Sequence, residues 1–304
     1  MDKKKYSGII PAFYACYDKN GDISAEATEA LTEYLISKGI TGLYVCGSSG
    51  ECIYQGVAER KKTLEHVMKV ARGRITVIAH VACNNTNDSC ELAAHAESLG
   101  VDAIAAIPPI YFRLPDYAIA EYWNTISKAA PNTDFIIYNI PQLAGVALTP
   151  SCLSEMLKNP RVIGVKNSSM PVMDIDTFKA IGGEDFVVFN GPDEQLAAGL
   201  VMGAVGGIGG TYGAIPELYV KIKERVDAHD SEGAYKLQRV ANEIISALCS
   251  CHGHMYAVIK ETIKIRTGLD LGGVRSPLAN LTEDDMPKVQ RAVELIESAL
   301  IKSL

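Results

Sequence analysis

Two apolar runs and the helical segment between them decide the fold: Ile75-Thr76-Val77-Ile78-Ala79-His80, a segment that stops at Gly100, and Ala103-Ile104-Ala105-Ala106-Ile107. Neither run alternates strictly between apolar and polar residues, which is typical of a parallel strand buried on both faces. A glycine directly after a helical pattern is the residue expected at a left-handed C-terminal cap. Strand, helix and strand in this order predict a parallel pair joined by a right-handed crossover.

The same unit recurs along most of the chain. Further strand-like runs lie at residues 8–13, 42–46, 135–138, 162–166 and 186–189, with a weaker glycine-rich run at 203–208. Two more helical segments stop at a glycine, Gly39 and Gly73. About eight strand–helix repeats predict a closed (β/α)8 TIM barrel. A doubly wound open sheet is the alternative, but the first strand lacks the glycine-rich phosphate turn typical of that fold.

After about residue 230 the strand-like runs cease and helical patterns continue. One helix is marked by Leu237, Val240, Ile244 and Leu248, a second spans 255–266, and a third includes residues 289–300. No linker or low-complexity segment separates these helices from the barrel. We therefore expect a barrel over residues 1–229 and a C-terminal helical extension over 230–304, as one structural unit.

Composition excludes several classes of protein. The 304 residues contain 29 Lys and Arg against 36 Asp and Glu, a net charge of −7, which argues against binding to nucleic acid or an anionic membrane. Hydrophobic residues make up 48% of the chain, so it has enough apolar side chains for a large core. Eight cysteines without a C-x-x-C pair, and no signal-type segment, predict reduced, buried thiols in a cytoplasmic protein.

The strongest candidate for chemistry is Lys166, at the end of the run Val162-Ile163-Gly164-Val165. In a parallel barrel, functional residues stand at the carboxyl ends of the strands. A lysine in an apolar barrel mouth is poorly solvated, which lowers its pKa and leaves part of the amine uncharged and nucleophilic. The alternative is a structural lysine whose ammonium reaches solvent or pairs with an acid.

Two further features stand at neighbouring strand ends. Tyr138 ends the preceding strand, where its phenol would reach over the lysine and move protons; the alternative is an aromatic plug of the core. Gly47-Ser48-Ser49-Gly50-Glu51 follows the second strand, and its hydroxyl and N–H groups suit an anion, either carboxylate or phosphate. The two glycines are expected to let the backbone approach that ligand closely. His252-Gly253-His254 has no third ligand nearby, so no metal site is predicted.

Together, Gly-Ser-Ser-Gly-Glu at 47–51, Tyr-Asn-Ile-Pro at 138–141 and Gly-Val-Lys at 164–166 resemble the N-acetylneuraminate lyase / dihydrodipicolinate synthase family of pyruvate-dependent aldolases. The resemblance covers essentially the whole chain. Leu143 stands where the synthases typically carry an arginine for a second substrate carboxylate. Asn190-Gly191-Pro192-Asp193-Glu194 is similar to the segment with which the lyase branch binds sugar hydroxyls. These details favour the lyase branch.

The resemblance implies a role for each matching position. Lys166 would form the Schiff base, Tyr138 would transfer protons, and Ser48 and Ser49 would bind the pyruvate-derived carboxylate. The sugar tail would be held by Ser168, Gly191, Asp193 and Glu194. Tyr111 matches an aromatic that reaches across a subunit contact. Gly210 departs from the pattern, because lyases commonly carry a substrate-contacting serine there.

The resemblance also implies a reaction and an assembly. The reaction would be reversible cleavage of N-acetylneuraminate, a sialic acid, to N-acetylmannosamine and pyruvate, with no metal or organic cofactor. The assembly would be a homotetramer. Two alternatives stay open: a dihydrodipicolinate synthase or another 2-keto-acid aldolase, and a sugar-sensing barrel that binds its ligand without chemistry.

Overall fold

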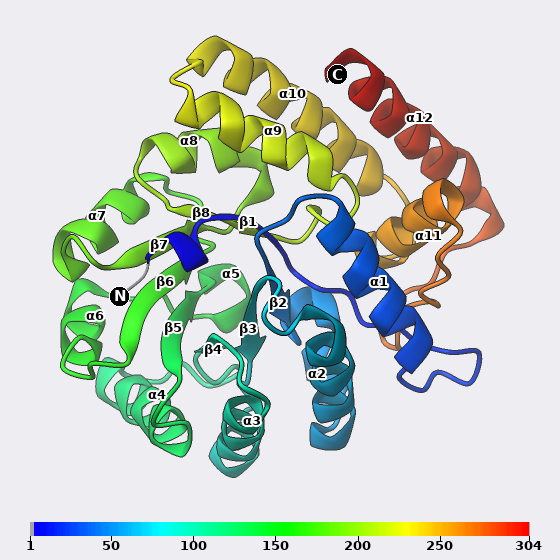
Figure 1. The fold of residues 1–304 in the computed structure, drawn as a ribbon. Helices are drawn as coiled ribbons and strands as arrows, with labels where there is room; N and C mark the ends of the chain where they lie inside the picture. The colour runs from blue at the N-terminus through cyan, green and yellow to red at the C-terminus, as the bar shows by residue number, and fades with distance from the viewer. Residues whose placement is uncertain (1–2, 304) are drawn as a thin grey trace.

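Eight parallel strands surrounded by helices form the body of the protein, as seen in the computed structural model, which describes residues 3–303 (Figure 1). The strands pair in the order β1-β8-β7-β6-β5-β4-β3-β2, all in parallel. An isolated parallel bridge between Ala12 and Tyr44 joins the first and second strands. The predicted (β/α)8 barrel is therefore confirmed.

The strands agree with the predicted runs to within a few residues at each end, because loop residues beside a strand share its apolar character. They are β1 (Gly8–Pro11), β2 (Gly42–Val45), β3 (Thr76–His80), β4 (Ala103–Ala106), β5 (Asp134–Asn139), β6 (Val162–Asn167), β7 (Val187–Asn190) and β8 (Gly206–Gly209).

Helices follow the strands and, apart from the short α5, cover the outside of the barrel (Figure 1). They are α1 (Ala25–Ser37), α2 (Val57–Ala71), α3 (Thr86–Leu99), α4 (Asp116–Ala129), α5 (Pro141–Ala144), α6 (Pro150–Met156), α7 (Met173–Gly182), α8 (Leu196–Val201) and α9 (Pro216–Asp227). Short 3-10 turns are η1 (Lys3–Tyr6), η2 (Ser48–Gly50), η3 (Cys52–Tyr54), η4 (Asp193–Gln195) and η5 (Glu283–Asp285). The three predicted glycine stops all have positive φ, with Gly39 at 78°, Gly73 at 72° and Gly100 at 75°.

The high glycine content of β8 is explained by the close approach of its backbone to that of β1. A Cβ atom at Gly206 would lie 2.1 Å from the carbonyl oxygen of Gly8 on β1, so no side chain fits there. The weak apolar signal of this run therefore reflects tight packing between the last strand and the first.

Two cores hold the fold together. One fills the barrel interior and contains Tyr44, Ile78, Ile136, Tyr138 and Phe189. The other lies between the strands and the helices, as in other barrels of this type. The cysteines only partly follow the expected burial, because Cys16, Cys46 and Cys152 are buried whereas Cys249 is exposed. All eight are free thiols.

The C-terminal extension consists of α10 (Ser231–Leu248), α11 (Met255–Thr267) and α12 (Met286–Ser303). These helices lie at one side of the barrel next to α9 and α1 (Figure 1). Within residues 3–303, no helix has both the length and the apolar character needed to cross a membrane.

Candidate active site

Lys166 and Tyr138 face each other at the carboxyl ends of β6 and β5. The two residues are register partners in the parallel ladder, so their side chains stand side by side. The Nζ atom of Lys166 lies 4.0 Å from the centroid of the Tyr138 ring and 4.3 Å from that of Tyr44. The sequence-based expectation that the phenol reaches over the amine agrees with this geometry.

The amine of Lys166 sits in a poorly solvated place. The residue is 5% exposed, and burial lowers its pKa to about 7, against the opposing influence of Asp193 and Cys52. Loss of water around the amine is the cause, because it disfavours the charged form. Near neutral pH a substantial part of the amine is therefore unprotonated and able to attack a carbonyl carbon.

Tyr138 remains a phenol under the same conditions. Burial raises its pKa to about 12, and hydrogen bonds with the side chains of Ser168 and Ser48 oppose that rise. The structure thus places three of the predicted residues, Tyr138, Ser48 and Ser168, close together. Neighbouring hydroxyl groups of this kind can pass a proton to a basic group of a bound ligand.

The loop that carries Ser48 and Ser49 forms the short turn η2. The N–H groups of Gly50 and Glu51 donate to the carbonyls of Gly47 and Ser48 within this turn. Ser49 is buried, and its side chain lies next to that of Tyr256. The hydroxyl groups of the two serines and their own N–H groups are therefore the groups that the loop offers to a ligand.

The two glycines of this loop are required by packing within the protein itself. A Cβ atom at Gly47 would lie 2.6 Å from the Tyr44 ring, and one at Gly50 would lie 3.3 Å from the carbonyl oxygen of Phe13. The glycines therefore let the loop pack onto the protein's own interior. The same packing fixes the position of Ser48 and Ser49.

Glu51 ties this loop to the C-terminal extension. Its backbone is left-handed, with φ 53°, and its carboxylate is buried. The Nζ atom of Lys260 on α11 lies 2.7 Å from Oε1, and the two side chains are 1% and 0% exposed. The hydroxyl of Tyr17 and the N–H of Arg275 both donate to Oε2. The extension thus stabilises the loop from behind.

The acidic residues after β7 have different surroundings. Asp193 is buried, and its Oδ2 accepts hydrogen bonds from the N–H and the hydroxyl of Thr211, at 2.6 and 2.5 Å. Burial raises its pKa to about 6. Glu194 is exposed and lines a groove beside α8 and α10. The structure brings Asp193 toward Lys166 but does not place Glu194 in the same buried cluster.

Gly191 and Gly210 border the site on either side. A Cβ atom at Gly191 would lie 2.0 Å from the hydroxyl of Ser168, which leaves no room for a side chain. At Gly210 the nearest atoms would be Oγ of Ser49 at 3.5 Å and the Tyr256 ring at 3.9 Å, an ordinary contact distance. A serine would therefore fit at position 210.

Tyr256, on the first turn of α11, was not found from the sequence. It contacts Ser49 and lies next to Gly210, so a residue of the extension borders the barrel mouth. No local pattern marks it, because its neighbours in the site are far away in the chain.

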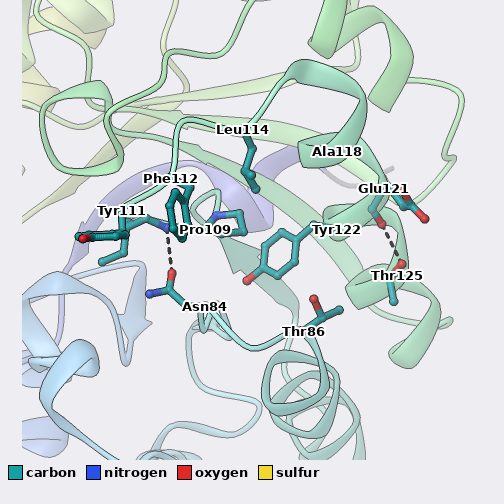
Figure 2. Close-up of a pocket in the computed structure, with 11 residues that line it drawn as sticks. Asn84, Thr86, Pro109, Tyr111, Phe112, Leu114, Ala118, Glu121, Tyr122 and Thr125 are labelled. Atoms are coloured by element: carbon teal, nitrogen blue, oxygen red, sulfur yellow. Dashed lines mark hydrogen bonds between the residues drawn. The ribbon is translucent and has the colours of Figure 1, made fainter.

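Tyr111 lies in the loop after β4, and its side chain is exposed to solvent. It is 89% exposed, has a positive φ of 87°, and stacks edge-to-face on Phe112. Figure 2 shows both rings beside a pocket of about 640 Å³ that Leu114 and Tyr122 also line. A bulky residue in the left-handed region is uncommon and costs free energy. Among residues 3–303, no group of three or more His, Cys, Asp or Glu is arranged to hold a metal ion.

An eight-stranded parallel barrel with a desolvated lysine and a phenol at its mouth has the features of a TIM-barrel enzyme that uses a lysine as its nucleophile. The chain belongs to the dihydrodipicolinate synthetase family, whose model matches residues 5–296.

Within this family, the chain is similar to several named lyases and to solved aldolase structures. An N-acetylneuraminate lyase of Mediterraneibacter gnavus is 64% identical over 301 residues, covering 99% of this chain and 96% of the relative. An N-acetylneuraminate lyase of Salmonella agona is 32% identical over 295 residues, covering 97% and 98%. The wild-type sialic acid aldolase of Ruminococcus gnavus matches with a TM-score of 0.98 at 64% identity, covering 99% of this chain and 100% of that one. A catalytic lysine mutant of a Ruminococcus gnavus sialic acid aldolase also gives 0.98, at 63% identity and 99% coverage of both chains.

Proposed function

We propose that this protein is a class I aldolase that reversibly cleaves N-acetylneuraminate to N-acetylmannosamine and pyruvate. The observation that carries the proposal is the amine of Lys166, which is buried, has a pKa near 7 and lies against the Tyr138 ring. The relatives that are 64% and 32% identical bear the name of this lyase. The solved aldolase that was changed at a catalytic lysine supports the assignment of Lys166.

The first half of the reaction forms a covalent intermediate. The uncharged amine of Lys166 attacks the C2 carbonyl of the open-chain substrate, and loss of water gives an iminium. Ser48 and Ser49 hold the adjacent carboxylate through their hydroxyl and N–H groups. This contact directs C2 toward the amine.

The second half breaks the C3–C4 bond. Tyr138 is a phenol at neutral pH, so it takes the proton of the C4 hydroxyl while it gives its own proton to the substrate carboxylate that Ser48 and Ser49 hold, and this proton later returns to C3 of the enamine. The iminium accepts the bonding electrons and becomes an enamine, and N-acetylmannosamine leaves. Protonation of the enamine carbon and hydrolysis then release pyruvate and restore Lys166.

The sugar part would lie between β6, β7 and β8. Ser168, Gly191, Asp193 and Glu194 follow or border these strands, and carboxylates accept hydrogen bonds from hydroxyl groups. Because Thr211 already occupies one oxygen of Asp193, the other oxygen is the one assigned to the substrate. Glu194 would turn inward when the sugar binds. Leu143 offers no charge for a second carboxylate, which favours this substrate over aspartate semialdehyde.

We further propose a cytoplasmic homotetramer that acts in carbohydrate metabolism without a metal or organic cofactor, with residues 230–304 as part of the barrel's structural unit. The exposed ring of Tyr111 and its left-handed backbone support a subunit contact in that region. Sedimentation of the Tyr111→Glu variant tests this point, with Ile301→Glu, an exposed apolar position on α12, as the control. Smaller species and reduced activity are expected for Tyr111→Glu alone, whereas an unchanged tetramer would contradict the proposed contact.

Assays with two substrate sets test the reaction. The protein is expected to release pyruvate from N-acetylneuraminate and to show little condensation of pyruvate with aspartate semialdehyde. Turnover of the second set alone would identify the synthase. Calorimetric binding of N-acetylneuraminate without pyruvate release would identify a sugar sensor.

A further inference from the structure

Tyr44 is a buried aromatic residue that the mechanism above does not use. It lies on β2 in the barrel interior and is 0% exposed. Its ring lies 4.3 Å from Nζ of Lys166, measured to the centroid, and stands edge-to-face with the Tyr138 ring at 5.7 Å. Nζ of Lys166 therefore contacts two aromatic rings.

The ring of Tyr44 also supports the carboxylate loop, because Gly47 packs directly against it. Its hydroxyl has no hydrogen-bond partner among residues 3–303. A buried hydroxyl without a partner destabilises the fold, so the hydroxyl gives no structural reason for a tyrosine here. The ring itself is the part that contacts the reacting amine.

The reaction needs a positive charge where water is scarce. Burial disfavours the protonated amine, and it disfavours the iminium of the first intermediate for the same reason. The face of an aromatic ring carries a negative potential that attracts a cation within about 6 Å. Other groups around the amine are Asp193, whose charge favours a cation, the thiol of Cys52, and His80, which burial keeps neutral.

We propose that Tyr44 is a further catalytic residue, whose ring face stabilises the cationic iminium on Lys166. This inference rests on the proposed Schiff-base function and deepens it. The cavity keeps the free amine reactive by excluding water, and the rings of Tyr44 and Tyr138 replace part of the lost hydration when the nitrogen becomes part of the cationic iminium. The hydroxyl of Tyr44 has no role in this step.

Three variants separate the ring from the hydroxyl and from simple packing. Tyr44→Phe keeps the ring, and Tyr44→Leu removes it. Phe189→Leu is the matched control, because Phe189 is equally buried in the same interior and is the register partner of Lys166 on β7. For each protein, one measures the pyruvate concentration that gives half-maximal borohydride-trapped adduct, and the pH midpoint of adduct formation.

Tyr44→Leu is expected to raise that pyruvate concentration about 3- to 30-fold, the range of a cation–aromatic contact. The pH midpoint of adduct formation is expected to fall in this variant, because the protonated amine of Lys166 also loses its contact with the ring. Tyr44→Phe and Phe189→Leu are expected to stay within about 2-fold of the parent, whatever their thermal stability. Unchanged adduct formation in Tyr44→Leu, or an equal loss in Phe189→Leu or Tyr44→Phe, would overturn the proposal. Absence of any adduct in the parent protein would instead refute the Schiff-base function itself.

Discussion

Tyr138 and Lys166 are register partners on neighbouring parallel strands, and Nζ of Lys166 lies 4.0 Å from the centroid of the Tyr138 ring. This relationship is fixed by the ladder between β5 and β6, whose hydrogen bonds leave little freedom for either Cα atom. The groups that would form the covalent bond and move the proton are thus both carried by strands of the barrel and not by loops.

The pH dependence of adduct formation follows from the two pKa values. As pH rises through about 7, Lys166 loses its proton, so the rate of pyruvate adduct formation is expected to increase and then level off above pH 8. Tyr138 does not limit the alkaline side, because its pKa is about 12. Stopped-flow or quenched trapping from pH 5 to 9 measures the profile. A rate that keeps rising tenfold per pH unit up to pH 9 would show that the amine has an ordinary lysine pKa.

Burial of Lys166 should cost stability at neutral pH. Its pKa in the folded protein lies below the unfolded value, so the folded state binds fewer protons between about pH 7 and 10.4, and stability from this group rises across that range. We therefore expect Lys166→Met to abolish turnover and to raise the free energy of unfolding by about 1–3 kcal/mol at pH 6. The gain should disappear near pH 10.5.

Urea denaturation at both pH values measures this effect. Lys158→Met is the control, because Lys158 is exposed and its replacement should change the free energy of unfolding by no more than about 1 kcal/mol. Unfolding of Lys166→Met at neutral pH would mean that Lys166 is a structural residue.

Position 210 has room for the hydroxyl that the related lyases commonly carry. In Gly210→Ser the new side chain would meet Ser49 and Tyr256 at ordinary contact distances. One added hydrogen bond to the substrate is expected to lower KM for N-acetylneuraminate about 2- to 10-fold with little change in kcat. Gly209→Ser is the matched control, since its Cβ would lie 2.2 Å from a carboxylate oxygen of Asp193 and should disrupt the site. A KM that stays the same or rises in Gly210→Ser would mean that the substrate does not reach this position.

Removal of one partner of the buried Lys260–Glu51 ion pair should strongly destabilise the fold. Lys260→Met leaves the buried carboxylate of Glu51 without its cation, and a loss of about 3–5 kcal/mol in the free energy of unfolding is expected. Lys260→Met combined with Glu51→Gln should recover part of that loss. The exposed pair Lys236–Glu232 is the control, where Lys236→Met should cost about 0–1 kcal/mol. Equal effects in the two single variants would show that the buried pair does not stabilise the loop.

The barrel and its main chemical groups could be predicted because both are local in the sequence. An apolar run marks a buried strand, and the residues at its carboxyl end lie at the barrel mouth, which suffices to place Lys166 and Tyr138 there. Tyr256 and Lys260 could not be found in this way, because Lys260 meets Glu51 from 209 positions away and no periodic pattern records that contact.

The structural roles of individual residues were harder to predict than their positions in the fold. Gly47 was found as part of a ligand loop, but its small size serves the contact with Tyr44. Asp193 and Glu194 are adjacent in the chain, yet one is buried against Thr211 and the other is exposed. Such differences depend on which face of a turn each side chain occupies, and sequence spacing alone does not set this.

The measurement that tests the central claim most directly is mass spectrometry after reduction of the protein with borohydride in the presence of pyruvate. The account predicts one added three-carbon acid on the peptide that contains Lys166, and none on Lys260, whose ammonium is held by Glu51 and the carbonyl of Gly273. An unmodified Lys166, under conditions in which the protein is folded, would contradict it.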